Sequence, residues 1–208
     1  MMQKKSTRVV DATSYVLHTT PWRETSLLVK VFSRDHGILL MAAKGAKRPY
    51  SGLRAVLSVF QPAQLSWAGR NEVRTLMRAE SVGALNIAGS TLMSCWYMNE
   101  LLLKTLPRED PHPNLFDAYD TALRQLATGC SPHPVLRRFE WLFLQETGYG
   151  SDEPMPDFDD PKQAAQTKHV LRRRIVEHLE LNKLATRDVM RSLQPFASNR
   201  TSPIPHIE

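Results

Sequence analysis

Residues 26–43 read SLLVKVFS, RDHG and ILLMAA, and this stretch decides the fold of the first third of the chain. The first and last runs are rich in aliphatic and β-branched residues, which favour strands. Between them, Asp35-His36-Gly37 is typical of a hairpin turn. The nearly continuous apolar character of residues 26–33 predicts a strand that is largely buried.

The same pattern extends in both directions from this hairpin. Before it, we expect a strand at 15–18 and a turn at 21–25. After it, we expect strands at 60–67 and 72–80 around a tight turn at 68–71. Five short strands with a longer connection after the third predict an OB-type barrel, a fold that often binds oligonucleotides. Sm-like and SH3-like barrels also have five short strands, so the count alone leaves them open.

The longer connection, residues 43–54, reads AKGAKRPYSGLR and contains four cations, two glycines, one proline and no carboxylate. Glycine allows the backbone to approach a partner closely, and proline stiffens the turn. Such a loop suits a phosphate backbone. The alternative is a solvated, charged connection without any partner, because basic clusters are common on protein surfaces.

Charge is divided unevenly along the chain. The net charge of +6 is made up of +8 for residues 1–80, −7 for 81–160 and +5 for 161–208. A basic first third and an acidic middle indicate that these two parts of the chain bind different partners. We expect the basic first third to bind polyanions. The 208 residues are enough for one large domain or two small ones.

Several classes of protein are disfavoured by composition. No apolar run is long enough to cross a bilayer, and the basic start lacks an apolar segment behind it, so we expect a cytoplasmic protein. Cys95 and Cys130 are the two cysteines, and no histidines have metal-ligand spacing. We therefore expect no disulfide framework, no metal and no cofactor.

After Gly83 the apolar period becomes helical. We expect one helix up to Pro107, a second capped by Asn114, a third from Pro134 to Gly148, and two more over 162–181 and 187–193. In the first, the expected buried stripe contains Leu92, Cys95, Trp96, Leu102, Leu103 and Leu106. The fold class is thus α+β: an N-terminal five-stranded OB-type barrel, residues 1–82, followed by an all-helical domain, residues 83–208, with an acidic linker at 150–161 and a loose tail at 198–208.

Seven segments occur in a characteristic order: YVLH (15–18), RETSL (23–27), AKGA (43–46), LRAVL with FQP (53–57, 60–62), NELL (99–102), LRRFE (136–140) and GYG (148–150). In this order and spacing they resemble the bacterial RecO family of DNA repair and recombination mediators. The resemblance covers most of the chain up to Gly150. Many members of that family have a longer segment after GYG, in some with four zinc-binding cysteines. This chain has no cysteine there, so a zinc site is not carried over.

The resemblance implies an OB domain followed by a helical domain, and a protein that is not an enzyme. It implies binding of single- and double-stranded DNA and annealing of complementary strands. It also implies that the protein works with RecR to load the RecA recombinase onto strands coated by single-strand-binding protein (SSB). We expect a monomer that associates with the nucleoid.

Candidate DNA contacts are the cations of the barrel, because affinity without sequence readout comes mostly from neutralised phosphates. They are Lys44, Lys47, Arg48, Arg54, Arg70 and Arg74, with Arg23 and Arg34 in second place. Trp22, Tyr50 and Trp67 could stack on bases. Tyr50, inside the basic loop, is the preferred candidate, whereas Trp67 is expected to pack in the core.

Arg137 and Arg138 stand out as cations in an acidic region. By resemblance, the helical domain receives the acidic C-terminal tail of SSB. Such a tail ends in apolar residues and a free carboxylate, and therefore requires an apolar pocket with an arginine at its mouth. The alternative is a salt bridge within the helices, to Glu140 or Glu100.

Three rival functions remain at this point. An RNA-binding OB protein would have the same basic barrel. A nuclease would use the acidic residues at 152–160 with magnesium, but these lack the glycine and spacing of a metal loop and read as a solvated linker. A purely structural adaptor would show no salt-dependent affinity for nucleic acid.

Overall fold

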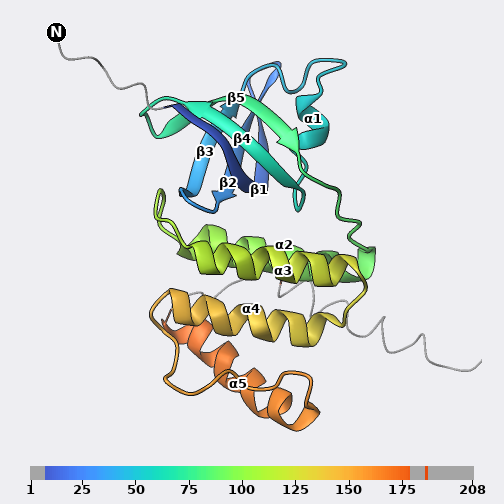
Figure 1. The fold of residues 1–208 in the computed structure, drawn as a ribbon, viewed down its shortest axis with the longest axis vertical. Coiled ribbons are helices and arrows are strands. Elements are labelled where there is room, and N and C mark those ends of the chain that lie inside the picture. Colours follow the sequence, from blue (N-terminus) through green and yellow to red (C-terminus); the bar gives the residue numbers. More distant parts are fainter. Residues whose placement is uncertain (1–7, 179–185, 187–208) are drawn as a thin grey trace, which may run out of the picture.

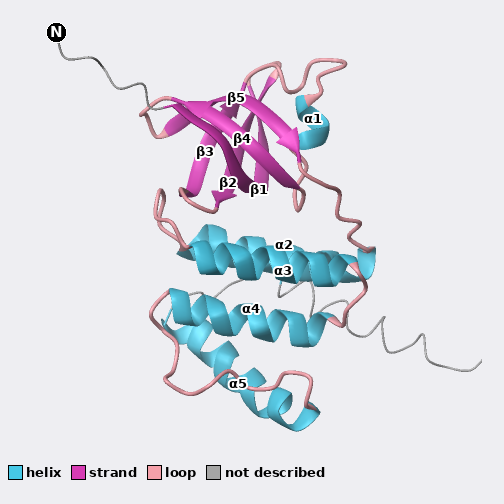
Figure 2. Cartoon of the chain, viewed as in Figure 1, coloured by secondary structure: helices cyan, strands magenta, loops and turns pink. Residues whose placement is uncertain are grey.

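The computed structural model describes residues 8–178 and Thr186. Its first part is a closed barrel in which the strands follow the order β1-β2-β3-β5-β4, with β3 and β5 parallel and all other neighbours antiparallel (Figures 1 and 2). The expected OB-type barrel is confirmed. Its elements are β1 Arg8–Trp22, β2 Ser26–Ser33, β3 Gly37–Ala43, α1 Leu53–Val56, β4 Pro62–Ala68 and β5 Val73–Ser81.

Two strands differ from their expected bounds. β1 continues to Trp22, where a turn was predicted, because one half of the strand pairs with β4 and the other half with β2. β4 begins at Pro62 and not at Phe60. Phe60 has a φ of 65° and belongs to the helical core, so it lies outside the barrel ladder. The short helix α1 was not predicted.

The helical part contains α2 Gly89–Thr105, α3 Pro113–Ala127, α4 Pro132–Glu146 and α5 Pro161–His178, stacked below the barrel in Figure 1. The predicted cap at Asn114 is wrong: His112 occupies the N-cap position of α3 without a capping side-chain hydrogen bond, and the side-chain amide of Asn114 donates to Glu146 at 3.0 Å. α4 begins two residues before the predicted Pro134. α5 was expected to reach residue 181, but residues 179–181, the helix predicted at 187–193 and the tail at 198–208 lie outside the described residues.

The buried face of α2 is wider than predicted. Leu92 is exposed and Trp96 and Leu103 are half-buried, whereas Tyr97, Met98 and Leu101 are buried. α2 contacts β1 of the barrel and also α3 and α4. A helix between two layers needs apolar residues on both sides, so a single stripe could not describe it.

A second hydrophobic core joins the barrel to the helices. The barrel has its own interior, which includes Val31, Met41 and Leu65. By contrast, Tyr15 and Phe32 point out of the barrel and pack with the helices, and the ring of Tyr15 meets that of Tyr119 edge-on at 5.2 Å. Burial of these aromatic rings makes the barrel and the helices one packed body.

Polar groups inside this joint are satisfied by one another. The Asn99 amide donates to the Leu17 carbonyl at 2.8 Å, and the Tyr119 hydroxyl donates to Asn99 Oδ1 at 2.5 Å. The Tyr15 hydroxyl donates to Asp120 at 2.5 Å. Burial raises the pKa of Tyr119, and burial together with Asp120 raises the pKa of Tyr15, so both phenols stay protonated donors.

The β2–β3 turn approaches the α2–α3 connection closely. A Cβ on Gly37 would lie 2.2 Å from the Asp110 carbonyl oxygen, and Gly37 has a φ of 68°. Next to it, the Glu109 amide donates to the Ile38 carbonyl at 3.0 Å. Only glycine fits this position without moving the turn.

The acidic segment at 150–160 is irregular but packed. Phe158 is buried in the helical core, and the Asp159 amide donates to Asp157 at 2.9 Å. The Lys162 amide donates to Asp160 at 2.9 Å, at the start of α5. Among the described helices, none combines the length and the apolar composition needed to cross a bilayer.

Candidate nucleic-acid interface

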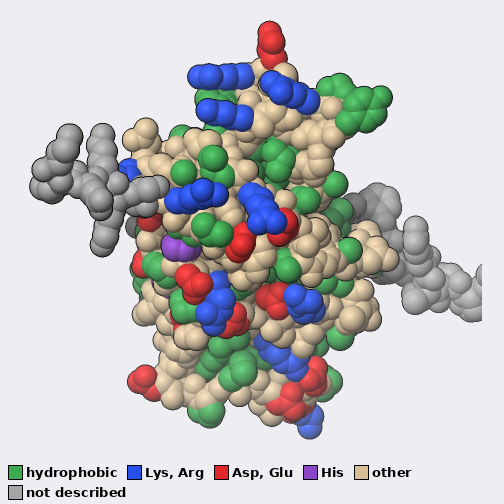
Figure 3. All heavy atoms as spheres, turned by 45° about the horizontal axis from the view of Figure 1, so that its top comes forward, with side chains coloured by type: hydrophobic (Ala, Val, Ile, Leu, Met, Phe, Trp, Pro, Cys, Tyr) green, Lys and Arg blue, Asp and Glu red, His purple; other side chains and the backbone are tan. Residues whose placement is uncertain are grey.

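The basic loop, residues 43–54, lies at the end of the barrel that points away from the helices (Figure 1). β3 begins beside the helices at Gly37 and ends at Ala43, so the chain enters the loop at the far end of the barrel. In the space-filling view, Lys and Arg side chains gather at this end around an acidic side chain at its tip, whereas basic and acidic side chains lie close together lower down (Figure 3). The basic loop thus forms a separate cationic surface.

The backbone of the basic loop is anchored at several points. Ala46 is fully buried in the barrel core, and the Lys47 amide donates to the Thr25 carbonyl in the β1–β2 turn at 2.9 Å. Further along, the amide of Ser51 donates to Arg48 at 3.1 Å, and Leu57 is buried where α1 ends. These anchors fix the loop in place while its long side chains point into solvent.

Gly45 gives the loop its first reversal. Its φ is 73°, and the Arg48 amide donates to its carbonyl at 3.0 Å. The Arg48 side chain also crosses over Gly45, with Cδ 3.5 Å from the place that a Cβ would occupy. A left-handed backbone favours glycine here, which is a different reason from the close approach to a partner that the sequence suggested.

The cations of the loop are exposed and available. Lys44, Lys47, Arg48 and Arg54 form no ion pair with any other described residue. Arg23, in the neighbouring β1–β2 turn, places its guanidinium 4.3 Å from the centre of the Trp22 ring. The structure therefore brings five of the candidate cations to one end of the barrel. Glu24 is the acidic residue in the same turn.

The three candidate aromatic residues differ in exposure. Tyr50, within the basic loop, is completely exposed and has a φ of 64°. Trp22 is half-buried beneath Arg23. Trp67 is buried in the barrel core and meets His36 edge-on at 5.1 Å, which confirms the expectation that it packs inside. Tyr50 is thus the side chain with a free ring face for a base.

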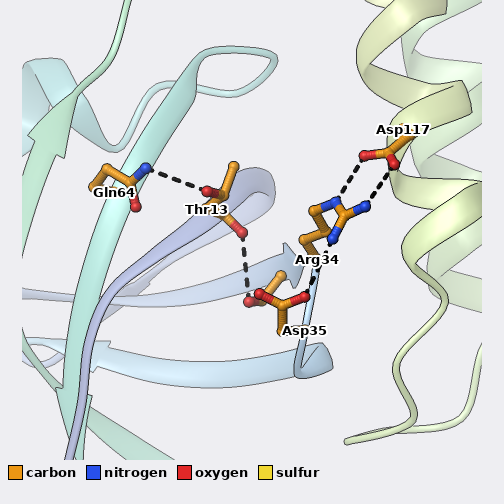
Figure 4. A network of polar contacts seen from close by, with 6 residues as sticks. Thr13, Arg34, Asp35, Gln64 and Asp117 are labelled. Carbon is orange, nitrogen blue, oxygen red and sulfur yellow. Dashed lines mark hydrogen bonds and ion pairs between the residues drawn. The ribbon is translucent and has the colours of Figure 1, made fainter.

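Arg34 and Arg74 are held in ion pairs between the barrel and the helices. Arg34 binds Asp117 of α3 through two parallel hydrogen bonds, and also contacts Asp35 (Figure 4). This pairing lowers the pKa of Asp117. Arg74 donates to the Gly69 carbonyl at 2.8 Å and to Glu109 at 2.7 Å. Both arginines hold the two parts of the protein together.

Arg70 lies apart from the basic loop, on the exposed turn between β4 and β5. This turn is near the α2–α3 connection, because its Glu72 pairs with Arg108. The structure therefore does not bring Arg70 together with the cations at the far end of the barrel.

Arg137 and Arg138 have different environments on α4. Arg137 pairs with Glu140, which is buried and also accepts a hydrogen bond from the Tyr97 hydroxyl at 2.6 Å. Arg138 pairs with Asp159 and is more exposed. It lies at a pocket of about 280 Å³ between α3 and α4, which the apolar side chains of Val135, Phe139, Leu142 and Met155 help to form.

Sequence reasoning missed a pocket beside the basic loop. Its wall includes His18 at the end of β1 and Trp96 of α2, which are far apart in the chain. Trp96 had been assigned to the core stripe, and no local pattern links it to His18. Over the described part of the chain, no group of three or more His, Cys, Asp or Glu side chains could hold a metal ion.

Comparisons with known proteins agree with this architecture. Residues 8–85 match the family model "Recombination protein O N terminal", and residues 88–153 match "Recombination protein O C terminal". The chain is 56% identical over 144 residues to the DNA repair protein RecO of Azoarcus sp. (strain BH72). The aligned region covers 69% of this chain and 59% of the relative. Its identity to the protein of the same name from Cupriavidus pinatubonensis is 54% over 147 residues, or 70% of this chain and 50% of the relative. The chain thus spans about half to three fifths of the length of these curated relatives.

Proposed function

Because this chain belongs to the RecO family, we propose that it is a non-enzymatic, DNA-binding mediator of recombinational DNA repair. In this proposal it binds single- and double-stranded DNA and anneals complementary strands. It then acts with RecR as a direct partner, and with RecA as an indirect one, on single strands coated by SSB. It would act as a monomer at the nucleoid.

The observation that carries the proposal is the set of unpaired cations on the basic loop. Lys44, Lys47, Arg48 and Arg54 are exposed and form no ion pair with the described residues, whereas Arg34 and Arg74 are engaged elsewhere. Exposed cations on an anchored loop, with a fully exposed tyrosine among them, suit a flexible polyanion with stacking bases. Arg23, in the adjacent turn, extends the same surface.

The test is the salt dependence of binding to a single-stranded oligonucleotide. With about five cations in contact, log affinity should fall against log salt with a slope of about −3 to −4. Replacing Lys44, Lys47 and Arg48 together with alanine should flatten this slope to about −1 to −2. The matched control is the triple alanine variant of Lys162, Lys168 and Arg172 on α5, which should keep the slope of the unaltered protein. An unchanged slope in the loop variant would remove the loop from the site.

Annealing and nucleic-acid choice need a second measurement. The protein should accelerate annealing of complementary oligonucleotides coated with SSB, and the basic loop variant should not. Competition between DNA and RNA strands of one length then separates the DNA mediator from an RNA-binding OB protein. Intact oligonucleotides after long incubation with magnesium would argue against the nuclease.

The helical part provides a candidate site for the SSB tail. The pocket between α3 and α4 has a mixed lining, in which apolar side chains alternate with polar ones and with Asp117, whose charge is neutralised by Arg34. Arg138 lies at this pocket with a third of its side chain exposed. An acidic tail could replace Asp159 as the partner of Arg138 and bury its apolar end in the pocket. Arg137 is a weaker candidate because it neutralises the buried Glu140.

A fluorescent peptide with the SSB tail sequence tests this site. Arg138→Ala should weaken peptide binding about tenfold, while the stability of the protein changes little, because its partner Asp159 is exposed. Arg137→Ala should lower the free energy of unfolding by about 1–3 kcal/mol, since it leaves Glu140 buried without its cation. Full peptide affinity in Arg138→Ala would exclude this pocket.

A further inference from the structure

A pocket of about 620 Å³ opens between the barrel and α2, directly beside the basic loop. Its volume is within the range of about 300–1,000 Å³ that is typical of small-molecule sites. The wall comes from the end of β1, the start of β2, the basic loop, α1 with the turn after it, and α2. The lining includes His18, Lys47, Arg54, Leu57, Ser58 and Trp96.

We propose that this pocket receives one unstacked base of a single DNA strand, while Lys47 and Arg54 hold the neighbouring phosphates. The proposal rests on the DNA-binding function above and deepens it. In this proposal the DNA strand binds to α2 as well as to the barrel.

The chemistry of the wall fits a nucleotide. Lys47 and Arg54 supply positive charge, and no residue of the lining is acidic. Leu27, Leu57 and Val59 supply apolar surface for a base. The imidazole of His18 and the indole of Trp96 supply aromatic surface, which can pack against any base without reading its identity.

Trp96 packs against a buried aromatic ring at this position. Its ring meets that of Phe60 nearly edge-on, with centres 5.0 Å apart and an angle of 77° between the planes. Phe60 in turn is buried and has a left-handed backbone, with a φ of 65°. A bulky residue keeps such a conformation only where its surroundings enforce it, so the turn before β4 fixes the indole beside the pocket.

The end of β1 that lines the pocket has one edge with which no described strand pairs. β1 pairs with β4 only up to Tyr15, whereas its pairing with β2 continues to Trp22. From His18 to Trp22, one edge of β1 therefore has no strand partner among the described strands. Unpaired backbone groups at a strand edge can bond the polar edge of a base, as they can bond another strand.

An acidic peptide with an aromatic end is the competing occupant. Its carboxylates could pair with Lys47 and Arg54, but such a peptide offers one aromatic end to the pocket and no ring beside each charge. A DNA strand would continue from the pocket over Lys44 and Arg48, which are exposed on the same loop and form no ion pair with the described residues. The continuous line of cations favours the long polyanion.

A substitution that fills the pocket tests the base site independently of the DNA-binding function. Ser58 is exposed and lines the pocket, so Ser58→Phe should fold normally and occupy the space of the base. We expect about 5- to 100-fold weaker binding of a single-stranded oligonucleotide, with an unchanged salt slope because no charge is altered. Ser90→Phe, at an exposed position in the first turn of α2, is the matched control and should bind normally.

Crosslinking identifies the occupant. A strand that contains 5-bromouracil should crosslink to His18 or Trp96 in the unaltered protein and lose this crosslink in Ser58→Phe. Normal affinity of Ser58→Phe, with crosslinks only in the loop, would overturn the base pocket and leave the DNA-binding function intact. An acidic peptide that crosslinks to His18 or Trp96 where DNA does not would also overturn it. Absence of any salt-dependent DNA binding by the unaltered protein would overturn both proposals.

Discussion

Arg34 and Asp117, 83 residues apart, face each other so that two parallel hydrogen bonds join them: Nε donates to Oδ1 at 2.9 Å and Nη2 to Oδ2 at 2.8 Å (Figure 4). Arg34 follows β2 and Asp117 belongs to the second turn of α3. The paired geometry makes an oriented contact between the barrel and the helices at the exposed edge of their shared core.

This pair should make stability depend on pH in acid. Arg34 lowers the pKa of Asp117 in the folded state, so the stabilisation is fully present above the unfolded pKa, about 3.9, and is lost as pH falls through the folded value. The unfolding free energy of the unaltered protein should therefore exceed that of Asp117→Asn at neutral pH, and the difference should shrink below about pH 4. Chemical denaturation at several pH values measures it. Asp152→Asn, at an exposed position without this pairing, should show no such trend.

Gly37→Ala should destabilise the joint between the barrel and the helices. The new Cβ would lie 2.2 Å from the Asp110 carbonyl oxygen, and alanine disfavours a φ of 68°. We expect a loss of about 1–3 kcal/mol in the free energy of unfolding, measured by thermal or chemical denaturation. Gly52→Ala is the control, because Gly52 has a φ of −61° and open space around its Cα. Equal stability of the two variants would contradict the close approach.

Tyr50→Ala should weaken binding of single-stranded DNA without changing the stability of the protein. Tyr50 is fully exposed, so its removal takes nothing from the core. Loss of one stacked base corresponds to about 1–3 kcal/mol, which is about 5- to 150-fold in affinity. Tyr50→Phe keeps the ring and should bind like the unaltered protein in a fluorescence anisotropy titration. If Tyr50→Ala bound equally well, the ring would have no stacking role.

The two cysteines should react with thiol reagents at very different rates. Cys130 is exposed, whereas Cys95 is buried and burial raises its pKa to about 12. Since the thiolate is the reactive form, Cys95 should be almost inert in the folded protein. Titration with a chromogenic disulfide reagent at neutral pH should detect one thiol quickly, and a second one only after unfolding. Fast reaction of Cys95 in a Cys130→Ser variant would show that the helical core opens readily.

Much of the barrel could be predicted from local patterns. Hairpin chemistry at Asp35-His36-Gly37 and the apolar runs on either side fixed two strands, because both signals come from neighbouring residues. The length of β1 could not be predicted, because it depends on pairing with two different strands. The buried face of α2 was missed for a similar reason, since its burial depends on layers that meet only in the fold.

The site was predictable to a similar extent. The cations of the basic loop lie close together in sequence, so the sequence alone grouped Lys44, Lys47 and Arg48 correctly at one place. It could not show that Arg34 and Arg74 are paired, because their partners Asp117 and Glu109 lie 83 and 35 residues away. The pocket between His18 and Trp96 was hidden for the same reason.

The core that Tyr15 and Phe32 share with the helices has a mechanical consequence. A hinge motion between the two parts would have to separate these packed aromatic rings. We therefore expect the barrel and the helices to move as one rigid body. The distance between the basic loop and the pocket of α3 and α4 is then constant, and so is the distance between any ligands bound there. In the proposed function, a DNA strand on the basic loop and an SSB tail between α3 and α4 would therefore meet through their own flexibility and not through bending of the protein.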